Sequence, residues 1–193
     1  SALEVVTTGT SHTAVGRNAM SSQQTGNYNT TVGVNSFTTS TDTSSNVGLG
    51  YIAGRYVTGS NNVAVGSGAM NGSSGGSNTS NNVAVGYASL FAITTANANV
   101  AIGKETLYST TTGGSNTALG HQAMYYGTES DSNVAVGTSA LEKNVTGDDN
   151  TAIGYQSQYG SSGQSHSNNT SVGYKSLYGV TTGGLNTAVG RNS

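Results

Sequence analysis

Apolar residues recur along the chain in short runs that each end in glycine, as in TAVG at 13–16, NTALG at 116–120 and NTAVG at 186–190. Val, Ile or Leu stands immediately before the glycine, Thr or Val stands two positions earlier, and a small residue lies between them. This alternation has a period of two, which predicts a short β-strand, and no stripe of period 3.6 suggests a helix. The glycine ends the strand where the backbone needs positive φ or close approach.

The run repeats along nearly the whole chain. Its glycines are Gly16, Gly33, Gly50, Gly66, Gly86, Gly103, Gly120, Gly137, Gly154, Gly173 and Gly190, with spacings of 17, 17, 16, 20, 17, 17, 17, 17, 19 and 17 residues. Such a period is typical of solenoids, in which each repeat is one structural unit. We therefore predict an all-β fold: a lead-in at 1–11 followed by a single domain at 12–193, a β-solenoid or β-roll of eleven turns.

Stacking of equivalent residues predicts ladders along such a rod. We expect each turn to hold two short strands and two turns, with neighbouring strands about 4.8 Å apart. Val and Ile should form a dry core row, and Asn99, Asn116 and Asn133 should form a row of hydrogen-bonded amides. Gly103, Gly120 and Gly137 mark the ends of the strands. The small residue between the apolar ones should face a partner, which favours a homotrimer around a common axis.

Composition limits the function. The 193 residues carry a net charge of −2, 7% charged residues, no Cys and no Pro. The absence of a basic stripe argues against nucleic-acid binding, and no apolar run is long enough for membrane insertion. Low net charge and the lack of Pro also argue against disorder.

Chemistry-bearing residues are few. His12 and His121 occupy repeat positions and His166 lies in a Ser-rich segment, so a surface or ladder role is expected for all three. Asp148 and Asp149 stand in TGDDN, which is typical of a turn. We expect no catalytic site, no metal site, no cofactor and no enzymatic activity.

Tyrosines fall into two columns. Tyr51, Tyr87, Tyr155 and Tyr174 follow the repeat glycine by one residue, and Tyr108, Tyr125, Tyr159 and Tyr178 follow it by five. Either the rings stack along the axis and stiffen the rod, or an exposed column binds sugar rings of a cell-surface glycan.

Two repeats are longer than 17 residues. The extra residues in 71–80 and 158–167 should protrude at one corner of the rod, as surface binding loops do. If this corner contacts a receptor, Tyr159 and His166 are the expected contacts, with Tyr155, Tyr174 and Tyr178 nearby.

The segments NTALGHQAMYYG at 116–127 and NTSVGYKSLYGVTTGGLNTAVG at 169–190 resemble repeats of phage and prophage tail-fibre proteins. They are also similar to NSVAIGxxS repeats in the heads of trimeric autotransporter adhesins. The resemblance implies a homotrimeric fibre segment on a virion or cell surface, whose partner is a glycan or an outer-surface protein. A bacterial adhesin head is the second reading, and an ice-binding solenoid, because of the Thr-containing rows, is the third.

Overall fold

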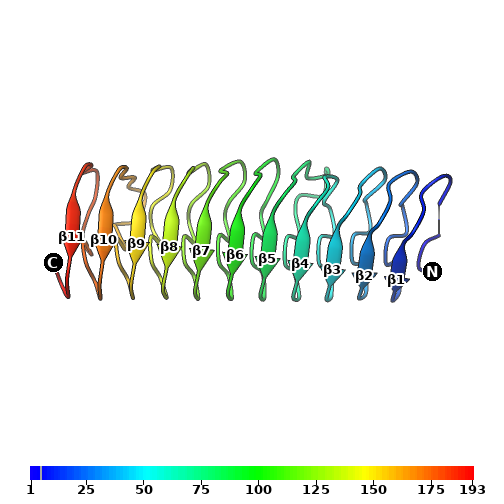
Figure 1. Cartoon of the computed structure of the whole chain (residues 1–193), viewed down its shortest axis with the longest axis horizontal. Helices are drawn as coiled ribbons and strands as arrows, with labels where there is room; N and C mark the ends of the chain where they lie inside the picture. The colour runs from blue at the N-terminus through cyan, green and yellow to red at the C-terminus, as the bar shows by residue number, and fades with distance from the viewer. Residues whose placement is uncertain (5) are drawn as a thin grey trace.

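The computed structural model describes residues 1–4 and 6–193, and it forms a rod with the two termini at opposite ends (Figure 1). Eleven three-residue strands lie side by side in chain order in one parallel sheet. Their bounds are β1 Thr13–Val15, β2 Thr30–Val32, β3 Val47–Leu49, β4 Val63–Val65, β5 Val83–Val85, β6 Val100–Ile102, β7 Thr117–Leu119, β8 Val134–Val136, β9 Thr151–Ile153, β10 Thr170–Val172 and β11 Thr187–Val189.

Equivalent residues of successive repeats pair across the sheet. In β6 and β7, for example, Ala101 lies opposite Ala118 and Ile102 opposite Leu119. The same register holds through the long repeats, where β4 pairs with β5 and β9 with β10. The predicted β-solenoid is therefore confirmed, and the glycine spacing does define its turns.

The expectation of two strands per turn is wrong. Outside the eleven strands, the described residues form only an isolated bridge between Val57 and Ser77. The rest of each turn passes through left-handed residues, such as Glu105, Leu107 and Ser115, with φ of 55°, 51° and 59°. Backbone hydrogen bonds still join these segments to the next turn, as Leu107 N donates to the Ala123 carbonyl at 3.0 Å. Because these bends interrupt the extended backbone, no further stretch of the turn is long enough to form a second strand.

The faces of the strands are also the reverse of the expectation. The middle residue of each strand points into the rod, and in β2 to β10 it is completely or almost completely buried. The apolar residues on either side of it face outward. Ala101 and Ala118 therefore belong to the chain's own core, and the small row is not a surface for a partner. Small side chains are needed there because larger ones enter the same space from across the turn.

Those larger residues stand four positions after the repeat glycine, and they include Met20, Phe37, Leu90, Leu107, Met124 and Leu141. Phe37 illustrates how their size is balanced. A Cβ on Gly48 would lie 2.6 Å from the Phe37 ring, and one on Gly54 would lie 2.2 Å from it. The next turn has glycine at both positions, and the missing side chains leave room for one large ring. The narrow core therefore remains densely packed.

The glycine and asparagine ladders are present as predicted. Gly103, Gly120 and Gly137 have φ of 138°, 134° and 130°. A Cβ on any of them would approach the carbonyl oxygen of the next glycine to 2.5–2.6 Å, so only glycine fits. In the asparagine ladder, Asn116 Nδ2 donates to Asn99 Oδ1 at 3.1 Å, and Asn133 Nδ2 donates to Asn116 Oδ1 at 3.1 Å.

Each asparagine also satisfies the backbone around it. The Asn116 backbone N donates to Asn99 Oδ1 at 2.9 Å, and Asn116 Nδ2 donates to the carbonyl of Ser130 at 2.7 Å. All three expected ladder asparagines, Asn99, Asn116 and Asn133, are completely buried. The ladder therefore provides hydrogen bonds to buried backbone groups on one side of the core, where water cannot reach them.

The two insertions leave the rod at the same corner, as predicted. Residues 73–75 and 161–164 are exposed. The first group lies between Gly72, whose N donates to the Phe91 carbonyl, and Ser77, whose N donates to the Tyr56 carbonyl. The second begins after Gly160, whose N donates to the Tyr178 carbonyl. Both therefore start six or seven residues after the repeat glycine.

Candidate functional site

A continuous apolar band runs along the outer face of the sheet. We call it the outer stripe, and it consists of the first and last residues of all eleven strands. Its first row holds six Thr and five Val, and its second holds seven Val, two Leu and two Ile. Leu119 keeps 45% of its surface exposed and Ile102 keeps 39%. No residue of the stripe is charged, so it is an unpartnered apolar surface on the isolated chain.

The outer stripe is wide enough to be significant. Eleven strands spaced by about 4.8 Å and three residues wide give an area of about 500 Å². Contiguous apolar patches of more than a few hundred Å² are uncommon on monomeric proteins and mark interaction sites. One residue beyond the repeat glycine, a more polar row borders the stripe, with Arg17, Tyr51, Lys104 and Arg191 among its exposed members. An apolar centre with a polar border is the usual anatomy of a protein interface.

Four of the five predicted contact residues come together near the C-terminal end of the rod. Tyr155 and Tyr174 stack with their ring centroids 5.3 Å apart, and Tyr159 and Tyr178 stack at 5.2 Å. Lys175 connects the two pairs, because its Nζ lies 5.6 Å from the Tyr174 centroid and 4.9 Å from the Tyr178 centroid. We call these five residues the tyrosine–lysine patch. The stacking expected for the columns is present here, and Tyr155, Tyr174 and Tyr178 are also exposed.

Stacking extends to the middle of the rod. Phe91, Tyr108 and Tyr125 form a second column with centroid distances of 5.1 and 4.9 Å and nearly parallel planes. All three side chains are partly buried, and each ring lies against its equivalent on the next turn. This column stabilises the stacking of turns.

Beside the patch, the inserted loop encloses a groove of about 200 Å³, lined by Tyr126, Lys143, Val145, Ser162 and Gly163. Lys143 joins the groove to the patch: its Nζ lies 5.0 Å from the Tyr159 ring centroid and donates to Ser162 Oγ at 3.2 Å. The Tyr159 hydroxyl donates to Glu142 Oε1 at 3.3 Å. Burial, and then the Glu142 carboxylate, raise the pKa of Tyr159, so its hydroxyl keeps its proton.

His166 does not belong to this surface. It is 2% exposed and points into the core, so the expectation of a receptor contact is wrong. Its backbone N donates to Asn144 Oδ1 at 3.1 Å, and its carbonyl accepts from Asn150 Nδ2 at 2.7 Å. Burial lowers the pKa of His166 to about 4, so the ring is neutral near pH 7. Residues 161–164 of the loop are exposed, while the imidazole is buried and neither of its nitrogens has a hydrogen-bond partner among the described residues.

The sequence pattern missed Tyr126, Lys143 and Lys175. None of them falls in a tyrosine column, and the partners of Lys143 lie on the following turn. One signal was present: Lys143 stands 19 residues before Ser162, which is the length of the repeat from Gly154 to Gly173. Residues one repeat apart are neighbours along a solenoid, so this spacing places them together.

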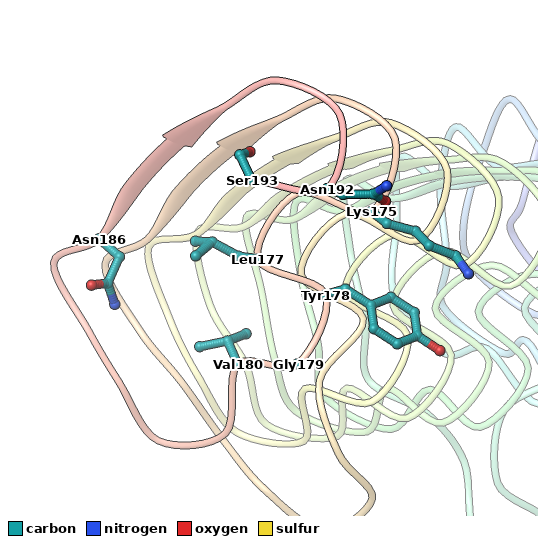
Figure 2. Close-up of a pocket in the computed structure, with 8 residues that line it drawn as sticks. All are labelled: Lys175, Leu177, Tyr178, Gly179, Val180, Asn186, Asn192 and Ser193. Atoms are coloured by element: carbon teal, nitrogen blue, oxygen red, sulfur yellow. The ribbon is translucent and has the colours of Figure 1, made fainter.

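The last turn leaves a hollow of about 570 Å³ at the C-terminal end of the rod. Figure 2 shows Leu177 and Val180 pointing into the space that this turn encloses, while Tyr178 and Lys175 lie on its outer side. In earlier turns the residue equivalent to Leu177, such as Leu141, is completely buried by the turn that follows it. The hollow is therefore the uncovered end of the core.

Among residues 1–4 and 6–193, no three His, Cys, Asp or Glu side chains are grouped so as to hold a metal ion. The same residues include no helix long and apolar enough to cross a membrane. No family model, curated protein or solved structure matches the chain.

Proposed function

We propose that this chain is a segment of an extracellular attachment fibre, of the kind found in the shaft or receptor-binding region of a phage tail fibre. In this proposal, copies of the chain associate through the outer stripe as a homotrimer. The tyrosine–lysine patch and the inserted loops are then the parts that contact a host cell surface.

The outer stripe is the observation that carries the proposal. An isolated rod would leave a sheet face of about 500 Å² in water, and its outward residues are uncharged and mostly apolar. Together with its polar borders, this face approaches the roughly 800 Å² per partner of a standard protein interface. The stripe follows the whole rod in register, so identical copies present matching rows along their full length. A long, stiff, self-associating rod suits a structural role in a fibre.

The trimer axis proposed here differs from the one expected from the sequence. The row of small residues is inside each chain, so the axis is expected along the row that ends the strands, which contains Ile102 and Leu119. This row points outward, and a larger or charged residue there leaves the chain's own core intact.

The test is the mass of the assembly. Ile102→Asp combined with Leu119→Asp places two carboxylates in the centre of the proposed interface, where their desolvation is costly. Light scattering after size exclusion should give a trimer for the native chain and a monomer for the double variant. Circular dichroism should show the same fold for both.

The matched control is Thr112→Asp, which adds a charge at an exposed position away from the stripe. It should keep the native mass. A native chain that is monomeric, or a double variant with an unchanged mass, contradicts association through this face.

A further inference from the structure

The groove beside Tyr126 has an apolar wall and a charged rim. Tyr126 is 47% exposed, and its ring is held edge-on against Tyr125 at a centroid distance of 4.7 Å. Val145 continues the apolar wall. Lys143 and the exposed Ser162 also line the groove, and they supply an ammonium and a hydroxyl 3.2 Å from each other.

These groups sit on a firm support. Tyr125 belongs to the stacked column, and the backbone N of Tyr126 donates to the Glu142 carbonyl at 3.0 Å. The Lys143 backbone N donates to the Tyr159 carbonyl at 3.1 Å. The wall and the ammonium therefore come from adjacent turns held at fixed spacing, which pre-organises the groove.

The size and chemistry restrict the ligand. A volume of about 200 Å³ is below that of pockets for drug-sized molecules, so it suits a single small ring. An aromatic face favours the C–H face of a flat ring, and a lysine at the rim favours an anionic substituent. The groove contains one lysine and no arginine, which fits a carboxylate better than the several charges of a phosphate.

We propose that this groove binds an acidic pyranose, a sugar ring carrying a carboxylate. The ring stacks on Tyr126, the carboxylate pairs with Lys143, and a ring hydroxyl hydrogen-bonds to Ser162. This inference rests on the attachment role proposed above and names its ligand class. A single site of this size is expected to bind weakly, with a Kd of about 1 mM. Repetition of the site on associated chains would then supply avidity.

The experiment uses three probes: sodium glucuronate, glucose and sodium acetate. Saturation-transfer difference NMR and calorimetric titration on the full chain should detect glucuronate binding. Glucose lacks the charge, and acetate lacks the ring, so each should bind roughly tenfold more weakly or not at all.

Two variants locate the site. Lys143→Gln should weaken glucuronate binding about tenfold and abolish the preference over glucose, because it removes the ionic partner. Tyr126→Ala should weaken both sugars. Tyr28→Ala is the matched control, since Tyr28 is an exposed tyrosine on another turn and lies outside the outer stripe and its border, and it should leave binding unchanged. Melting curves confirm that each variant is folded.

Three results would overturn the proposal: no saturable glucuronate binding by the native chain, acetate binding as tightly as glucuronate, or an equal loss in Tyr28→Ala. Because the assembly mass is measured separately, an intact trimer without sugar binding rejects only the groove. A monomer that binds glucuronate rejects only the proposed association.

Discussion

The core is filled differently in two regions of the rod. One region is the regular turns in the middle, and the other is the 19-residue turn between Gly154 and Gly173. In the middle turns, Leu107, Met124 and Leu141 fill the core against rows of alanine. In the long turn, Gln158 takes that place, and Ser171 replaces the facing alanine.

Hydrogen bonds satisfy the amide nitrogen of Gln158, whereas its Oε1 has no partner among the described residues. Gln158 Nε2 donates to Ser171 Oγ at 3.0 Å and to the Thr151 carbonyl at 2.8 Å. The Ser157 hydroxyl also contacts that of Ser171. A buried amide is tolerated because a hydroxyl appears on the next turn, just as Phe37 is tolerated because Gly48 and Gly54 make room. An unusual core residue on one turn is therefore accommodated by a matching change on the adjacent turn.

The largest expected effect comes from moving the amide without its partner. Leu107→Gln buries an amide opposite Ala118 and should lower the free energy of unfolding by about 3–5 kcal/mol. Adding Ala118→Ser recreates the Gln158–Ser171 pairing and should restore about 1–2 kcal/mol of that loss. Chemical denaturation of the single and double variants measures both values. If the serine gives no recovery, the two turns do not act as a pair.

The second effect should be the same in both regions, because the asparagine ladder runs through them unchanged. Asn169 Nδ2 donates to Asn150 Oδ1 at 3.4 Å across the long turn, and Asn116 makes the equivalent bond. Asn116→Ala leaves several buried backbone groups unpaired and should cost about 2–4 kcal/mol, and Asn169→Ala should cost a similar amount.

The exposed Asn78, which does not have a positive φ, provides the control for the ladder, and its replacement by Ala should change stability by less than about 0.5 kcal/mol. Thermal and urea unfolding would measure all three variants. A neutral Asn116→Ala would mean that the ladder does not stabilise the core.

The smallest effect is a pH dependence confined to the long turn. The pKa of His166 is lowered from 6.5 to about 4 in the folded chain, so the unfolded chain binds the proton more readily. The contribution of this group is full above pH 6.5, falls as the pH falls toward 4, and then levels off. Melting temperatures across this range should decline more steeply for the native chain than for His166→Gln.

Parallel curves for the native chain and His166→Gln would contradict a buried, neutral imidazole.

The sequence by itself determined the architecture. Glycine spacing defined the turns, because only glycine fits where each Cβ would meet the next turn's carbonyl, as at Gly120. Asn116 and its equivalents could be assigned to a ladder because equal spacing places identical amides above one another. The aromatic columns and the corner at which the insertions protrude were predicted in the same way, from the distance of each residue to its repeat glycine.

Only the tertiary structure decided which face of the strands is inside. An alternating pattern separates two faces but does not say which is buried, since Val and Ala are both common in cores. The answer depended on Leu107 and its equivalents, which enter the core from across the turn and leave room only for alanine. Their entry requires left-handed backbone at non-glycine residues, such as φ of 51° at Leu107. Local preference disfavours that conformation, and hydrogen bonds to the neighbouring turns hold it in place.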